Sequence, residues 1–333
     1  MPENPGSIGP LDWRAIVDEA LRRRKAEKLT QREHAALASV SIPTIVAFDR
    51  GERTLSLAKA FDILRVVGLI EEDGNEGAQE AFVKEAFTRW RALTAKLPAN
   101  SPGRFPNGWY RFDYALDGEL REPELPELQK IIEKSTIRHT GWPMFVSMSR
   151  PELAPREIDG VIECWVKPPE SGVERRLADP AHCDFWRAAP SGRFLLMRGY
   201  QEDSQEAVAP GTIFDTTLPI WRLGEGLLHA ARMASALRAG DAPEITVRFR
   251  ALYTGLTGRS LRSLQGQTLF LDETPAKSDE AMLEAVVPAT KIEGALADAV
   301  YPMVASLYER FGVAHLSPEF VAAEIGRFRS SRF

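Results

Sequence analysis

Four polar or charged side chains recur at helical spacing in the second half of the sequence. Arg222, Glu225, His229 and Arg232 follow one another at intervals of three, four and three residues, so they share one face if residues 218–237 form a helix. A guanidinium, a carboxylate and an imidazole on one face could bind a small anionic or polar ligand. The alternative is a salt-bridged helix face that binds nothing.

Two further arginines could complete such a ligand site. Arg198 lies in an expected strand over 194–200, and Arg259 follows an expected strand over 245–253. The segment TGLTGRS around Arg259 contains two glycines, which let a backbone approach a ligand closely. If both strands lie beside the helix over 218–237, the ligand site would comprise Arg198, Arg222, Glu225, His229 and Arg259.

Motifs for catalysis are absent from the sequence. TGLTGRS lacks the Gly-Lys-Ser/Thr ending of a phosphate-binding loop, and no G-x-S-x-G nucleophile motif occurs. We therefore expect no catalytic residue, no metal site and no cofactor. No pair of histidines has metal-ligand spacing among His34, His139, His182, His229 and His315.

Strong helix-start signals occur near the amino terminus. Thr30, with Glu33 three residues later, has the capping-box arrangement, which predicts a helix over 31–38. The run Ser39-Val40-Ser41 interrupts the apolar pattern, so the next helix must follow after a short turn.

A second helix is expected directly after this turn. Ser41 can cap it, Pro43 fits its first turn, and Gly51 can end it. Ser56 is a further cap, and apolar residues follow it at a 3.6-residue period up to Gly68. Two short helices joined by a three-residue turn, with a closing helix, are typical of a helix-turn-helix.

The pattern L-T-Q-x-E-x-A-x-x-A-x-V-S-x-x-T-I-x-x-x-x-x-G-x-R, over residues 29–53, resembles the Xre family of lambda-repressor-like DNA-binding domains. The resemblance covers about residues 12–69. It implies that the helix beginning after Ser41 lies in the major groove of double-stranded DNA, and that two copies read two half-sites as a homodimer.

The residues of the expected recognition helix differ from the usual ones. Ile42, Pro43, Thr44, Val46 and Ala47 stand where glutamine, asparagine, arginine or lysine would bond bidentately to base edges. Such a surface can contact thymine methyls, so sequence preference would come from those contacts or from DNA deformability. The alternative is a motif that has become a protein-interaction module. The expected DNA-binding residues are Gln31, Ser41, Ile42, Pro43, Thr44, Ala47, Arg50, Arg53 and Lys59, with Gln31, Ser41 and Thr44 as phosphate donors and the last three as cations.

Charge is unevenly distributed along the 333 residues, of which 44% are hydrophobic. Residues 12–69 contain 11 Lys+Arg and 8 Asp+Glu, a net charge of +3. The remaining residues contain 31 Lys+Arg and 39 Asp+Glu, a net charge of −8, from totals of 42 and 47. An electrostatic footprint for DNA is therefore confined to the amino-terminal part.

Cysteine content and hydropathy predict a cytoplasmic protein with no membrane partner. Cys164 and Cys183 are too few for a disulfide framework or a thiolate zinc site. No apolar run of about 18 residues occurs, and the first ten residues lack the features of a signal peptide.

The expected fold is mixed, with an all-α lambda-repressor-like helix-turn-helix domain followed by a larger α+β domain. We expect a flexible arm at 1–11, the DNA-binding domain at 12–70, a connecting segment at 71–105 and the α+β domain at 106–333. Expected strands cover 144–148, 160–167, 194–200 and 245–253, and expected helices cover 12–28, 126–134, 218–237, 291–311 and 318–328.

A helix expected over 79–97 has an apolar seam that could serve either of two purposes. It could form a dimer contact or pack on its own carboxyl-terminal domain. The seam consists of Phe82, Ala86, Trp90, Leu93 and Leu97.

Segments 198–225 and 254–262 resemble an uncharacterised module found with Schlafen/AlbA-type putative ATP-binding proteins, and this resemblance supplies no catalytic residue. Our leading hypothesis is a transcription regulator with a carboxyl-terminal sensing or oligomerisation domain. The alternatives are an enzyme or nucleotide-binding module with a helical targeting domain, and an antitoxin-like protein-interaction subunit.

Overall fold

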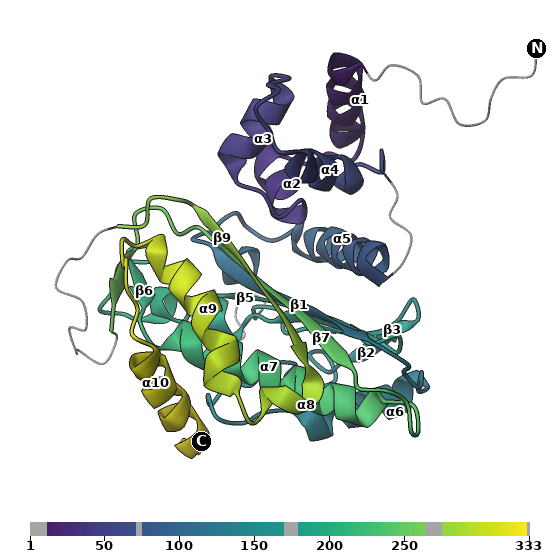
Figure 1. The fold of residues 1–333 in the computed structure, drawn as a ribbon, viewed down its shortest axis with the longest axis vertical. Coiled ribbons are helices and arrows are strands. Elements are labelled where there is room, and N and C mark those ends of the chain that lie inside the picture. Colours follow the sequence, from purple (N-terminus) through teal and green to yellow (C-terminus); the bar gives the residue numbers. More distant parts are fainter. Residues whose placement is uncertain (1–11, 71–74, 170–178, 264–274, 332–333) are drawn as a thin grey trace, which may run out of the picture. The chain divides into compact units, whose positions relative to one another are not determined.

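The structure is a computed structural model that describes residues 12–70, 75–169, 179–263 and 275–331. It combines helices with a large antiparallel sheet, so the chain has a mixed α/β fold (Figure 1). The chain forms two compact units, Met1–Glu80 and Ala81–Phe333. The expected arm at 1–11 lies outside the described residues. In the described part of the chain, no helix combines the length and apolar character needed to cross a membrane.

Four helices lie entirely within the described part of the first unit, and a capping side chain marks the start of each. The Thr30 hydroxyl accepts a hydrogen bond from the Glu33 amide while the Glu33 carboxylate accepts one from the Thr30 amide. Ser41 and Ser56 cap the next two helices through their hydroxyls. Gly51 follows at a φ of +74°, a left-handed conformation that suits glycine. The helices are α1 (Trp13–Ala26), α2 (Gln31–Leu37), α3 (Ile42–Asp49) and α4 (Leu57–Val66).

Polar contacts, one of them partly buried and one buried, connect these helices. The Arg24 guanidinium on α1 donates to both Asp49 carboxylate oxygens at the end of α3, at 2.9 and 2.8 Å. Nε2 of His34 on α2 lies 2.9 Å from the carbonyl oxygen of Ile63 on α4. Burial lowers the pKa of His34, so its neutral form is favoured. The apolar core between the four helices contains Val17, Leu37, Ile45, Phe48 and Leu64.

The second unit is built on a sheet with the strand order β2-β3-β4-β5-β1-β7-β9, in which every neighbouring pair is antiparallel. Strand β1 (Trp109–Asp117) lies between β5 (Arg193–Gly199) and β7 (Thr246–Thr254). The other strands of the sheet are β2 (Arg156–Ile158), β3 (Val161–Trp165), β4 (Phe185–Ala189) and β9 (Glu280–Pro288). A separate parallel pair consists of β6 (Ile213–Asp215) and β8 (Ser260–Arg262).

One face of the sheet packs against the longest apolar helix of this unit, α7 (Leu218–Leu237) (Figure 1). Alternate residues of β1 and β7 point toward it, including Phe112, Tyr114 and Phe249 in the buried core. The remaining helices of this layer are α6 (Leu125–Ser135), α8 (Ala289–Ile292), α9 (Leu296–Glu309) and α10 (Pro318–Ser330). The sheet and this helical layer enclose the core that positions α7.

Helix α5 (Asn75–Thr94) contributes its residues from Ala81 onward to the second unit. The Trp90 ring stacks on Phe105 at 5.8 Å. The Arg89 side chain donates to the Glu163 carboxylate of β3, at 3.0 Å. The seam residues Phe82, Ala86 and Trp90 are buried. Of the two purposes considered for this seam, the structure shows packing on the chain's own carboxyl-terminal unit.

The strands expected over 160–167, 194–200 and 245–253 are confirmed as β3, β5 and β7. The strand expected over 144–148 is wrong, because this segment is irregular. Its backbone instead bonds to side chains: the Met144 amide donates to Glu225, and the Val146 carbonyl accepts from the Trp186 indole. The single helix expected over 291–311 is two helices, α8 and α9, with a break at 293–295. Strands β1, β2, β4, β6, β8 and β9 were not predicted.

Candidate functional site

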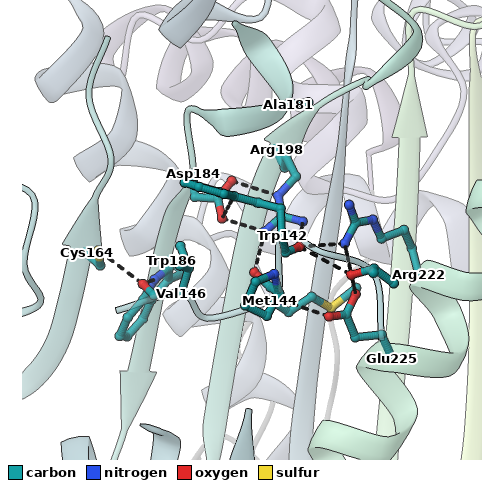
Figure 2. Close-up of polar contacts among 12 residues, drawn as sticks. Trp142, Met144, Val146, Cys164, Ala181, Asp184, Trp186, Arg198, Arg222 and Glu225 are labelled. Atoms are coloured by element: carbon teal, nitrogen blue, oxygen red, sulfur yellow. Dashed lines mark hydrogen bonds and ion pairs between the residues drawn. The ribbon is translucent and has the colours of Figure 1, made fainter. Parts of the chain in front are cut away.

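Glu225 on α7 organises a buried polar cluster, and Arg222 one turn earlier takes part in it (Figure 2). The Glu225 carboxylate accepts from the Met144 amide at 3.2 Å and from the Thr140 hydroxyl at 2.9 Å. Nη1 of Arg222 donates to Glu225 at 3.0 Å, to the Thr140 hydroxyl at 2.6 Å and to the Trp142 carbonyl at 2.7 Å. The expected helical pairing of Arg222 with Glu225 therefore exists, and it holds the 140–144 segment against α7.

Arg198 on β5 joins the same cluster from the sheet side. Its guanidinium forms a two-pronged ion pair with Asp184, at 2.7 and 2.5 Å, and donates to the carbonyls of Trp142 and Pro143. Both members of the Arg198–Asp184 pair are buried, with side-chain exposed fractions of 1% and 0%. Because four of the five guanidinium N–H groups have partners, Arg198 mainly holds the structure together.

A small hollow lies where α7, β1, β5 and β7 meet, and we name it the tyrosine hollow. Its empty volume is about 350 Å³ with the mouth included, and about 20 Å³ of this admits a water-sized group. It is lined by Tyr110, Tyr200, Tyr253, Phe214, Arg198, Arg222, Glu202, Gln201, Gly199, Ala181, Leu218 and Pro219.

At the tyrosine hollow, one hydroxyl has no partner in the described part of the chain, and one guanidinium uses only one of its nitrogens. The Tyr253 hydroxyl is buried and forms no hydrogen bond. Arg222 uses Nη1 alone, so its Nε and Nη2 groups form no described hydrogen bond. The exposed fractions of Tyr253 and Arg222 are 2% and 6%. A buried hydroxyl without a partner is costly, so the Tyr253 hydroxyl favours a small polar molecule in the hollow.

Glu202 is the acidic group of the tyrosine hollow. Its carboxylate accepts a hydrogen bond from the Asp215 amide at 2.7 Å. Burial is the largest cause that raises the pKa of Glu202, to about 7, and the Asp215 charge raises it further. Near neutral pH this group therefore exists both with and without its proton. Asp215 itself caps α7 by accepting from the amides of Thr217 and Leu218.

His229, also on α7, does not line this hollow and is buried in the core of the second unit. Its Nδ1 is 2.8 Å from the Tyr114 hydroxyl, and its ring stacks on Phe145 at 4.4 Å. Burial lowers the pKa of His229 to about 3, and the Arg232 charge lowers it further. His229 is thus a neutral core residue rather than part of a shared ligand face.

Arg259 does not line the tyrosine hollow either, and its guanidinium is fully engaged by other groups. It pairs with both Asp203 carboxylate oxygens, at 2.9 and 2.6 Å. Its other N–H groups donate to three backbone carbonyls, and its guanidinium lies 4.4 Å from the centre of the Tyr200 ring. The structure therefore brings together Arg198, Arg222 and Glu225 and separates them from His229 and Arg259.

Arg232, at the far end of the predicted stripe, faces a different and wider hollow. The empty volume of this wider hollow is about 1350 Å³ with its open mouth, and its lining includes His139, Arg238, Glu244 and Arg329. The Arg232 guanidinium donates to the Thr136 carbonyl at 3.3 Å. Thus the four-residue stripe extends past the core and does not line one site.

Sequence reasoning did not select Tyr110, Tyr253, Glu202 or Asp184 as site residues. Tyr110 and Tyr253 belong to neighbouring strands and face each other across the β1–β7 register, a pairing that no local motif signals.

Metal and disulfide chemistry have no support in the described ranges. No group of three or more His, Cys, Asp or Glu could hold a metal ion there, and Cys164 and Cys183 are free and buried.

In the first unit, three side chains were expected to donate hydrogen bonds to DNA phosphates, and two of them are hydrogen-bonded to each other. The Ser41 and Thr44 hydroxyls are 2.8 Å apart. The Gln31 side-chain amide donates to Asp49 at 2.6 Å. Of the other expected DNA-binding residues, Pro43, Arg50, Arg53 and Lys59 are exposed, and Ile42 and Ala47 are half-buried.

No protein-family model matches this chain, and neither a curated protein nor a solved structure matches it. The fold and the site on their own define a mixed α/β protein of two compact units, with a small, incompletely satisfied polar hollow in the larger one.

Proposed function

We propose that the chain is a DNA-binding transcription regulator of the Xre type, which works in the cytoplasm and reads operator DNA as a homodimer. In this proposal the first unit is a lambda-repressor-like helix-turn-helix domain, and the second unit senses a ligand or mediates oligomerisation. The observation that supports it best is the pair of capped helices α2 and α3 joined by residues 38–41, with Arg50 and Arg53 exposed directly after α3.

The exposed cations define what kind of DNA contact to expect. Arg50 has an exposed side-chain fraction of 71% and only a long contact, 3.8 Å, to Glu52. Arg53 and Lys59 are also exposed. Since Gln31, Ser41 and Thr44 already have partners, phosphate contacts would come mainly from the three cations. Such binding weakens steeply with salt.

The decisive test is the affinity for duplex DNA at several salt concentrations. For Arg50→Ala/Arg53→Ala we expect weaker binding and a slope of log affinity against log salt that is smaller by about 2, one for each lost phosphate contact. The matched control is Arg121→Ala/Arg156→Ala, which removes two exposed arginines from the second unit. Equal slopes in all three proteins, or no duplex binding by the native chain, would remove the proposal.

A protein-interaction subunit is the second candidate function, and one observation favours it. Leu57 and Phe61 lie one turn apart on α4, with exposed fractions of 69% and 38%. Exposed large apolar side chains on one helix face are typical of protein contacts. A copurifying partner that is lost in Leu57→Ser/Phe61→Ser, together with no DNA binding, would support this candidate.

A further inference from the structure

We propose that the wider hollow is a binding site for a small phosphorylated polyol, such as a sugar phosphate, whose phosphate binds among the guanidinium groups of Arg232, Arg238 and Arg329. The hollow lies within the second unit, so the inference goes beyond the proposed DNA binding by the first unit and does not depend on it. Of the stripe predicted on α7, only Arg232 lines this hollow.

The wider hollow is large enough for such a ligand. About 570 Å³ of its volume admits water-sized groups, within the range of about 300 to 1,000 Å³ that is typical of small-molecule sites. The carboxyl-terminal half of α7 lines it, and α8 and α10 pack against α7. Glu244 and Ile245, directly before β7, also contribute. Because several segments far apart in the chain form this hollow, it is a feature of the folded unit and not of one loop.

Three guanidinium groups meet at this hollow. Arg232 lies within α7, Arg238 directly follows that helix, and Arg329 lies near the end of α10. Like charges gathered on one concave surface repel one another and attract an anion. A phosphate group has three strong acceptor oxygens and up to two negative charges, so it can bond to more than one guanidinium at once.

These guanidinium groups are available to a ligand. The Arg238 side chain forms no hydrogen bond or ion pair in the described part of the chain. Arg232 and Arg329 each donate to a backbone carbonyl, and neither is paired with a carboxylate among the described residues. The carboxylates of Glu244 and Glu293 line the same hollow and still leave the three arginines unpaired. An anion from outside the chain is therefore the expected partner.

The rest of the lining favours a ligand that carries hydroxyl groups. Glu244, Glu293 and Ser235 provide oxygens that can accept hydrogen bonds from such hydroxyls. The two carboxylates would repel an extended polyanion such as a nucleic acid. The described lining contains no Phe, Tyr or Trp, and its imidazole, that of His139, packs against Phe328 at 4.9 Å between ring centres. A nucleobase would thus find no large free ring on which to stack, so a sugar phosphate fits better than a nucleotide.

The test uses glucose 6-phosphate as the probe and the full chain as the receptor, with binding measured by calorimetry. We expect glucose 6-phosphate to bind and glucose, which lacks the charge, not to bind. Ethyl phosphate, which has the charge without the ring hydroxyls, should bind more weakly. No binding of glucose 6-phosphate, equal binding of glucose, or equal binding of ethyl phosphate would overturn the assignment. Displacement of glucose 6-phosphate by duplex DNA would indicate a polyanion surface and would overturn it too.

Two variants locate the phosphate, and a third is the matched control. Arg238→Ala and Arg329→Ala should each weaken binding of glucose 6-phosphate on the order of tenfold, because each removes a hydrogen bond between charged groups. Arg310 follows α9 as Arg238 follows α7, is also exposed, and does not line the hollow. Arg310→Ala should therefore bind as the native chain does. Native affinity in both hollow variants, or equal weakening in all three, would overturn the proposal.

Arg238→Ala also separates a binding role from a structural role. Since the Arg238 side chain has no partner in the described structure, its removal should leave the Tm unchanged without ligand. Glucose 6-phosphate should raise the Tm of the native chain and raise that of the variant less. A lower Tm with an undiminished ligand effect would show a structural arginine and count against the site. Binding of glucose 6-phosphate without any DNA binding would leave this inference standing and remove the proposed function, and the reverse result would do the opposite.

Discussion

Replacing His229 with leucine should make the second unit less sensitive to acid. His229 is fully buried, and burial lowers its pKa from 6.5 to about 3. Between these two values the unfolded chain binds a proton at this residue and the folded chain does not. Stability contributed by the neutral histidine is therefore present above pH 6.5 and is lost as the pH falls toward 3.

The size of this effect follows from the two pKa values. Linkage predicts a slope of about 1.4 kcal/mol per pH unit well below the unfolded pKa. Integrated from pH 7.5 to pH 5, with the folded and unfolded values of 3 and 6.5, the loss is about 2 kcal/mol. This is a large share of the stability of a typical domain.

The measurement is urea unfolding of the double variant Tyr114→Phe/His229→Leu at pH 7.5 and pH 5. Tyr114→Phe is included because the Tyr114 hydroxyl bonds to His229 and would otherwise be left buried without a partner. Tyr114→Phe alone is the control and should keep the acid loss. Every other titrating group, including His34 and Glu202, is common to both proteins and cancels in the comparison. If the double variant loses as much stability as the control, burial of a neutral His229 is not the cause.

Two further predictions concern buried charges. Glu202 should give the opposite pH dependence of stability, and Glu202→Gln should remove it. Because the pKa of Glu202 is raised from 4.5 to about 7 in the folded chain, the free energy of unfolding of the native chain should fall by about 2 kcal/mol through this group as the pH rises from 5 to 7.5. Urea unfolding at both pH values measures this, and an unchanged loss in the variant would contradict it. Asp184→Asn should cost about 3 to 5 kcal/mol, because it leaves Arg198 buried without its counter-ion. Asp18→Asn, in an exposed pair with Arg14, should cost less than about 1 kcal/mol; similar losses in thermal unfolding would refute the contrast.

The sequence alone located the helices of the first unit and several elements of the second. The capping box of Thr30 and Glu33 and the caps at Ser41 and Ser56 were all predicted. Each depends on residues no more than three positions apart, so the signal is complete within the local sequence. Helix α7 was likewise predicted with its observed bounds, 218–237.

The tertiary structure alone decided which polar residues share a site. Arg222 and Glu225 pair because they are one helical turn apart, which the sequence does show. Tyr253 and Arg198 reach the same hollow from β7 and β5, which neighbour β1 on opposite sides. Strand order and register are set by packing between residues far apart in the chain, and a one-residue change of register would turn Tyr253 to the other face of the sheet. For the same reason Arg259, with a promising glycine-rich setting in sequence, proved to be occupied by Asp203, 56 positions away.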